Sequence, residues 1–370
     1  MEIRRNALVL AVLCAFLLAG CGGDGKKETA DKGKSGGSAS ETGVDSGKEG
    51  GIAAEEKAKV TGEIMIEGSS TVEPISNQAK LGFNADYANV EISVGGEGTS
   101  NGFKSFTKGE TDISDASRPI KQKELDGCKE NKVEFYELPV AYDGLTFVVN
   151  NDNEAVNELT IDQLKKIFVE GGVKTWKELD PAWPDEAIRA YMPGTGSGTY
   201  DYAYEVLAKK DGKKLRNEND IVTMSEQDNV LVDGVKKDKF GIGFFGFAYY
   251  ESNKNDLKAV KIVNKAGKAV VPTMSTIESG EYAPFSRPLF IYVNKGSLDK
   301  IQVELFVYYY LENAKKLAED AKYVALPQSL YDAAIENIED EIVGTHFIDE
   351  SGEKRSGALS DVFKRENIKK

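Results

Sequence analysis

Residues 191–200 read Tyr-Met-Pro-Gly-Thr-Gly-Ser-Gly-Thr-Tyr, a loop of small and hydroxyl-bearing residues that runs into the first turn of a predicted helix. The glycines let the backbone come close to a ligand, and Ser197 and Thr199 supply hydroxyl donors. The free N–H groups of a helix start point the same way. The stretch is therefore equally consistent with an anion-binding loop and with an ordinary helix N-cap that binds nothing.

The same pattern occurs three more times near the N-terminus, where a predicted strand ends in a hydroxyl-rich loop that opens a helix. These strands and loops are 62–67 with 68–71, 90–94 with 95–102, and 111–114 with 115–119. A tetrahedral oxyanion needs donors from several directions, which short hydroxyl side chains and backbone N–H groups supply without bulk. Four such loops together favour an anion cleft beyond the carboxyl ends of the strands of an α/β fold.

The rest of the chain adds strands and helices that fit an α/β fold. Strands are predicted over 135–142, 145–149, 187–191, 240–247 and 288–293, and helices over 160–168 and 301–321. Thr160 is a predicted N-cap. The second helix has a predicted apolar stripe of Leu305, Phe306, Tyr309 and Leu311.

The composition is that of a globular protein of two ordinary domains. The chain has 370 residues, is 40% apolar and carries a formal net charge of −14. This charge disfavours nucleic acid or an acidic membrane surface as a partner, and it repels an anionic ligand at long range. An anion site in this chain must therefore work through local donors.

The N-terminus carries an export signal followed by a tether. Arg4 and Arg5 precede an apolar run over 7–18, and the order Leu-Ala-Gly-Cys21 resembles the bacterial lipoprotein signal, which implies acylation of Cys21. We expect residues 1–20 to be a signal peptide and 21–60 a disordered linker, because the latter segment has almost no large apolar residue. Only Cys128 lies in the predicted globular part, so no internal disulfide is expected there.

Motifs of catalysis and of metal binding are weak in this sequence. Thr195 and Thr199 stand where a Gly-x-Ser-x-Gly elbow requires glycines around Ser197. Residues 96–102 miss the dinucleotide fingerprint by one position, and no phosphate loop ending in Gly-Lys-Ser/Thr occurs. His346 is the only histidine, for which we expect a structural role. We therefore predict no catalytic residue, no metal site and no cofactor.

Taken together, the motifs resemble those of the periplasmic phosphate-binding proteins of bacterial phosphate ABC transporters. The resemblance covers about residues 62–350 and rests on 68–74, 98–100, 112–120, 194–200, 241–250 and 286–293. It implies the periplasmic-binding-protein type II fold, in which two α/β lobes joined by a two-segment hinge hold the ligand in the interlobe cleft. By resemblance, lobe 1 is 61–146 plus 286–370, lobe 2 is 147–285, and the hinge lies near 142–149 and 287–293.

The resemblance also implies phosphate-binding residues. These are Ser70, Thr71, Thr99, Ser100, Ser117, Arg118, Ser197, Gly198 and Thr199. Many family members have an aspartate where Ser117 aligns, and an arginine where this chain has Pro193. We infer that Arg118 supplies the missing positive charge, so Arg118→Ala is expected to weaken binding far more than Arg189→Ala. Candidates for the missing carboxylate are Asp115, Glu73 and Asp112, and the sequence does not choose among them.

The predicted function follows from this resemblance. We expect a protein, monomeric and lipid-anchored at the cell envelope, that binds inorganic phosphate, ignores sulfate and delivers phosphate to an ABC-type membrane permease. A phosphate ion carries a proton at neutral pH and sulfate does not, so a carboxylate acceptor discriminates between them. Two alternatives stay open: a secreted phosphate-releasing hydrolase that uses Ser197, and a phosphate-binding sensor or adhesin without a transport role.

Overall fold

A computed structural model describes residues 54–195, 197–225 and 227–370 of the chain. The predicted signal peptide, Cys21 and most of the predicted linker lie outside these residues. Within the linker, residues 54–57 form a one-turn helix, α2 (Ala54–Lys57), so the prediction of disorder is wrong for these four residues. Residues Val60–Lys370 form one unit, which contains every strand of the described chain.

Three parallel strands form the N-terminal part of the sheet, and β1 (Gly62–Gly68) lies between β2 (Val90–Gly95) and β3 (Ile113–Ala116). Parallel neighbours require crossover connections, which here contain α3 (Glu73–Asn84) and α4 (Thr99–Phe106). In the register, the carboxyl end of β1 lies opposite the ends of both neighbours. This pairing brings the three predicted hydroxyl-rich loops to one edge of the sheet.

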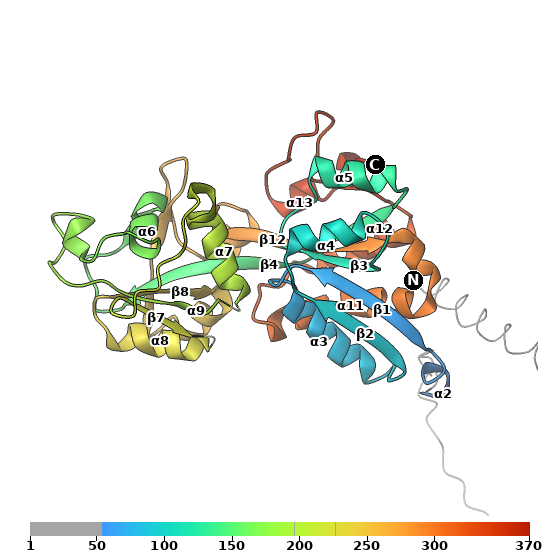
Figure 1. Cartoon of the computed structure of the whole chain (residues 1–370), viewed down its shortest axis with the longest axis horizontal. Coiled ribbons are helices and arrows are strands. Elements are labelled where there is room, and N and C mark those ends of the chain that lie inside the picture. Colours follow the sequence, from blue (N-terminus) through green and yellow to red (C-terminus); the bar gives the residue numbers. More distant parts are fainter. Residues whose placement is uncertain (1–53, 196, 226) are drawn as a thin grey trace, which may run out of the picture. The chain divides into compact units, whose positions relative to one another are not determined.

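Two long antiparallel strands, β4 (Phe135–Asn150) and β12 (Ser286–Asn294), continue the sheet (Figure 1). The sequence predicts two strands over 135–149, and the structure has one, because Asp143 and Gly144 also pair with β12. Every residue of β4 is buried. Asp143 remains in the strand because Arg287, its partner across the pair, contacts its carboxylate.

The middle of the chain builds the other end of the sheet, whose strand order is β2-β1-β3-β12-β4-β8-β6-β7. The added strands are β8 (Gly241–Gly246), β6 (Arg189–Pro193) and β7 (Val222–Ser225), with β9 (Leu257–Ala259) paired to β4. A separate small sheet contains β5 (Glu158–Thr160), β10 (Lys261–Val263) and β11 (Ala269–Val270). The helices of this region are α6 (Ile161–Phe168), α7 (Gly198–Leu207), α8 (Asp228–Lys237), α9 (Phe247–Asn253) and α10 (Met274–Glu278).

The C-terminal part of the chain packs back against the N-terminal strands. Its helices are α11 (Ile301–Asp320), α12 (Gln328–Glu339) and α13 (Leu359–Val362), and α5 (Gln122–Glu130) lies earlier in the chain. Helix α11 contacts α3 and β4, and α12 contacts β4. Of the predicted apolar stripe, Phe306 and Leu311 are buried, whereas Leu305 and Tyr309 are only partly buried. No helix among the described residues is both long and apolar enough to cross a membrane.

Candidate anion-binding site

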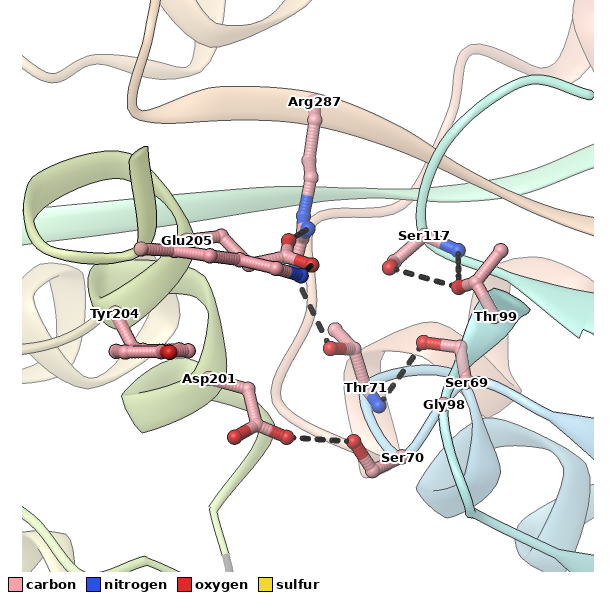
Figure 2. A pocket seen from close by; sticks show the side chains of 11 residues that line it. Ser69, Ser70, Thr71, Gly98, Thr99, Ser117, Asp201, Tyr204, Glu205 and Arg287 are labelled. Carbon is pink, nitrogen blue, oxygen red and sulfur yellow. Dashed lines mark hydrogen bonds and ion pairs between the residues drawn. The ribbon is translucent and has the colours of Figure 1, made fainter. Parts of the chain in front are cut away.

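A cavity of about 200 Å³ lies at the carboxyl ends of β1 and β3, beside α7 (Figure 2). Hydroxyl groups and four charged side chains line it. The lining residues are Ser69, Ser70, Thr71, Gly98, Thr99, Ser117, Asp201, Tyr204, Glu205, Lys209 and Arg287. The cavity therefore contains both the donors that an anion requires and carboxylates that would repel an anion without a proton.

The loop after β1 presents its hydroxyls because its backbone turns sharply at Gly68. The φ of Gly68 is +149°, and an added Cβ would lie 2.1 Å from the carbonyl oxygen of Asp115, so this position requires glycine. The N–H of Ser69 donates to that same carbonyl oxygen at 2.9 Å. The N–H of Thr71 donates to Oγ of Ser69 at 3.2 Å, which fixes the turn that opens α3.

The loops after β2 and β3 are joined to each other and to the loop after β1. The N–H of Gly98 donates to the carbonyl oxygen of Gly68 at 2.6 Å. Oγ1 of Thr99 lies 3.1 Å from Oγ of Ser117 and accepts the N–H of Ser117, also at 3.1 Å (Figure 2). The three loops thus form one hydrogen-bonded wall of the cavity.

Helix α7 forms the opposite side of the cavity. Its N-cap, Ser197, accepts the N–H of Thr199 at 3.2 Å. A Cβ added to Gly198 would lie 2.7 Å from Cα of Thr71, so the start of α7 lies directly against the loop after β1. One turn into the helix, Oδ2 of Asp201 accepts the hydroxyl of Ser70 at 2.9 Å.

Arg287 of β12 brings a positive charge into the cavity. Its Nη2 lies 3.2 Å from Oγ1 of Thr71, its Nη1 lies 3.0 Å from Oε2 of Glu205, and its Nε lies 3.3 Å from Oδ2 of Asp143. The guanidinium carbon lies 3.7 Å from the ring centroid of Tyr202. Burial alone would lower the pKa of Arg287, but the neighbouring carboxylates raise it above its usual value, so the side chain is a permanent cation.

The structure brings only part of the predicted site together. Four of the predicted hydroxyl residues line the cavity: Ser70, Thr71, Thr99 and Ser117. Predicted residues at the start of α7, Ser197, Gly198 and Thr199, lie beside the cavity but not among its described lining residues. Ser100 and Arg118 also lie outside that lining, although Ser100 accepts an Arg118 N–H at 3.1 Å.

The guanidinium group of Arg118 makes its ion pair away from the cavity. Its two terminal nitrogens donate to the two carboxylate oxygens of Glu124 at 2.9 and 2.7 Å, and the group lies 5.4 Å from the ring centroid of Phe103. Arg189, the comparison residue, is exposed and donates to the carbonyl oxygen of Asp220 at 3.3 Å. That Arg118 supplies the charge stays a prediction, and among the described residues Arg287 is the arginine that lines the cavity.

None of the three carboxylates considered from the sequence is among the described lining residues. Asp115 is fully buried beside Ser76, whose Oγ lies 2.9 and 2.8 Å from its two carboxylate oxygens, and burial raises its pKa to about 8. Asp112 pairs with Lys300 at 2.8 Å, and the Glu73 carboxylate occupies the space beside Gly96. The cavity carboxylates come instead from α7.

Sequence reasoning missed the four charged residues that line the cavity, Asp201, Glu205, Lys209 and Arg287. Asp201 and Glu205 are four residues apart, a spacing that places two side chains on one face of a helix, and this signal follows directly after the loop over 191–200. Arg287 stands in one of the motifs that carry the resemblance, but its position depends on the pairing of β12 with β4. The periodicity of hydrophobic residues along the sequence does not indicate which distant strands pair.

The described residues contain no group of three or more histidine, cysteine, aspartate or glutamate side chains that could hold a metal ion. Cys128 is buried and free, and burial raises the pKa of its thiol to about 12. A thiol in this state is a poor nucleophile and a poor metal ligand. The hydroxyl groups, Lys209 and Arg287 of the cavity can form hydrogen bonds and ion pairs with an anion.

Comparison with known proteins defines the class to which this fold and cavity belong. A family model described as a PBP superfamily domain matches residues 53–314, and the chain belongs to this superfamily. Its mixed α/β fold agrees with the fold predicted from the sequence.

Particular relatives are similar over most of their length. The chain is 45% identical to the phosphate-binding protein PstS of Staphylococcus haemolyticus over 271 residues, which are 73% of this chain and 83% of the relative. It is 43% identical to the protein SphX of Synechococcus elongatus over 308 residues, 82% of this chain and 89% of the relative. The resemblance inferred from the motifs is confirmed by these relatives.

A solved structure from Planctomyces limnophilus, described as a possible phosphate binding protein, is also similar. It shares 40% sequence identity with a TM-score of 0.73, and the match covers 76% of this chain and 99% of that chain. A phosphate transport receptor from Vibrio cholerae has the same fold at 24% identity and a TM-score of 0.54, over 72% of this chain and 100% of that chain.

Proposed function

We propose that the chain binds inorganic phosphate in the described cavity and delivers it to the permease of an ABC transporter. The observation that carries this proposal is the meeting of hydroxyl groups from three loops with the guanidinium group of Arg287. Relatives that are 40–45% identical and are named for phosphate binding support the choice of anion.

The binding energy of the proposed complex comes from neutral dipoles and one partly buried cation, Arg287. The Thr71 hydroxyl and one hydroxyl of the Thr99–Ser117 pair would donate to different oxygens of one tetrahedral ion, and the Ser70 hydroxyl would do so on exchanging its bond to Asp201 for one to the ion (Figure 2). Hydrogen bonds to a charged ion in a site shielded from water contribute about 1.5–3 kcal/mol each. This arrangement supports binding despite the net charge of −14, because local donors outweigh the long-range repulsion.

We propose that the Asp201 carboxylate accepts a hydrogen bond from the protonated oxygen of phosphate. Among the described residues its hydrogen-bond partner is the Ser70 hydroxyl, and no ion pair neutralises it, whereas Glu205 is paired with both Arg287 and Lys209. The protonated oxygen of a phosphate ion can donate a hydrogen bond to the Asp201 carboxylate. Sulfate has no proton at neutral pH and would meet only repulsion there.

Calorimetric titration of the full-length protein with phosphate and with sulfate tests the function. We expect one phosphate site at micromolar or lower Kd and no measurable sulfate binding. Absence of heat on addition of phosphate, in protein freed of any co-purified ion, would contradict the proposed function.

The Asp201→Asn variant tests the source of selectivity in the same titration. We expect phosphate to bind about ten- to a hundredfold more weakly and sulfate binding to appear, because the asparagine amide can donate to an anion without a proton. Glu205→Gln is the matched control on the same helix face, and it should change the affinity for both anions in the same direction. An unchanged ratio of the two affinities in Asp201→Asn would eliminate this role.

Export and anchoring complete the proposal. The sequence supports removal of residues 1–20 and acylation of Cys21, and we propose that the linker holds the body, a monomer, at the cell envelope. The proposed lobe boundaries, near 146 and 286, fall on β4 and β12. Mass spectrometry of the mature N-terminus checks the anchor: a diacylated Cys21 is expected, and an unmodified cysteine would contradict it.

A further inference from the structure

A buried carboxylate joins the two long strands to the C-terminal segment. Glu137 of β4 is 2% exposed, and its two oxygens accept four hydrogen bonds or close contacts. Oε1 accepts the hydroxyls of Tyr292 at 2.5 Å and of Thr345 at 2.7 Å. Oε2 accepts the backbone N–H of His346 at 2.7 Å and lies 3.2 Å from its ring Nδ1. The only histidine of the sequence is thus part of a buried network, in line with the structural role expected for it.

The Tyr292 hydroxyl extends this network to the wall of the cavity. Tyr292 is fully buried and stands directly opposite Glu137 in the pairing of β12 with β4. While its hydroxyl donates to Glu137, the same oxygen accepts the backbone N–H of Ile120 at 2.8 Å. Ile120 follows Ser117 by three residues, in the loop that leaves β3.

The ring of Tyr292 also contacts the second loop of this wall. It lies edge-on to Phe103 of α4, with the ring centroids 4.8 Å apart. Helix α4 begins at Thr99, whose hydroxyl accepts the N–H of Ser117. Tyr292 therefore contacts, through Ile120 and Phe103, the two chain segments that carry the Ser117 and Thr99 hydroxyls.

From this geometry we propose that Tyr292 is a positioning residue for anion binding. Its hydroxyl, oriented by Glu137, holds the backbone of residues 117–120 so that the Ser117 hydroxyl faces the cavity. Loss of the hydroxyl leaves the Ile120 N–H without its acceptor, and the loop must move or leave a buried donor unsatisfied. This inference rests on the proposed function, since its effect on binding presupposes that an anion occupies the cavity.

The Tyr292→Phe variant tests the proposal, and Tyr331→Phe is its matched control. Tyr331 is also buried, and its hydroxyl also accepts a backbone N–H, from Leu326 at 2.9 Å, and donates onward, to the carbonyl of Val140 at 3.0 Å. Both variants should lower the melting temperature. Only Tyr292→Phe should weaken phosphate binding, by about five- to tenfold, which corresponds to one lost hydrogen bond.

A double-mutant cycle separates positioning from a loss of stability. In a Ser117→Ala background, Tyr292→Phe should cause little further loss of phosphate affinity, because the hydroxyl that it positions is already absent. Additive effects of the two substitutions, or equal phosphate affinities for Tyr292→Phe and Tyr331→Phe, would overturn the proposal.

Amide hydrogen exchange without ligand gives a readout that does not depend on phosphate. Exchange at Ile120 should be faster in Tyr292→Phe than in wild type and unchanged in Tyr331→Phe. If the wild-type protein binds no phosphate, both the proposed function and the positioning role are contradicted, even if exchange at Ile120 is faster in Tyr292→Phe. If wild type binds phosphate but exchange at Ile120 is unaffected, only the positioning role is overturned.

Discussion

At the scale of single residues, the position of the positive charge determines which arginine can contact an anion in the cavity. Both arginines pair with carboxylates, Arg287 with Asp143 and Glu205 and Arg118 with Glu124, but it is Arg287 that also contacts a hydroxyl of the cavity lining. A guanidinium group presents several donors in a fixed plane, so it can contact a cavity hydroxyl, a carboxylate and an incoming anion together. We therefore propose that the cation comes from β12 and not from the loop after β3.

Comparison of Arg287→Lys with Arg118→Ala tests this assignment. Lysine keeps the charge beside the buried Asp143 and so protects the fold, but it loses the planar donors. We expect Arg287→Lys to weaken phosphate binding about tenfold or more by calorimetry, and Arg118→Ala to weaken it less. Arg189→Ala, at an exposed position, is the control. A larger loss in Arg118→Ala would restore the assignment inferred from the sequence.

At the scale of secondary-structure elements, the start of α7 depends on a glycine for its close approach to the loop after β1. A methyl group at Gly198 would lie 2.7 Å from Cα and 3.0 Å from Oγ1 of Thr71, so the helix start would have to move away from the loop. Asp201, one turn further on, would move with it. The distance between α7 and this loop therefore sets the geometry of the cavity.

Gly198→Ala tests whether this close approach is required for binding. Because the added methyl group would overlap the backbone of Thr71, the melting temperature should also fall, as expected for overpacking that costs about 1–3 kcal/mol. Phosphate affinity should fall about tenfold, because the added methyl group separates the two walls of the cavity. Gly246→Ala serves as the control, since its Cβ would meet only ordinary contacts. Unchanged phosphate affinity in Gly198→Ala would show that the close approach is not required for binding.

Elements with a clear local pattern can be predicted from the sequence, and those set by distant partners cannot. The alternation of residues 62–67 predicts β1, and the Thr160 cap predicts α6, which the structure confirms with a full capping box. The sequence divides β4 into two strands because Asp143 and Gly144 resemble a turn, and only the partner strand β12 keeps them extended. The polar helix α5 has no strong apolar stripe, so no local pattern predicts it.

The candidate site, too, can be predicted from the sequence only where local patterns define it. The hydroxyl residues that line the cavity follow predicted strands, so their loops are visible in the sequence. Arg287 and Asp143 are 144 positions apart, and only the register of β12 with β4 reveals their contact. The sequence predicts which loops form the wall, whereas the charges inside the cavity depend on pairing between distant segments.

At the scale of the whole molecule, a strongly acidic chain holds a small site built for an anion. The net charge of −14 opposes an approaching anion, and salt screens this repulsion over about 8–10 Å. Affinity must therefore arise after entry, from donors that converge within the cavity. Because the ion is recognised at short range, we expect a single, well-defined place for it.

A crystal structure of the full-length protein grown with phosphate would show directly whether the cavity is the binding site. We expect one tetrahedral ion in the cavity, with the hydroxyls of Ser70, Thr71, Thr99 and Ser117 and the guanidinium group of Arg287 within hydrogen-bond distance. Phosphate bound elsewhere, or a cavity that stays free of phosphate under conditions where calorimetry detects binding, would contradict this assignment.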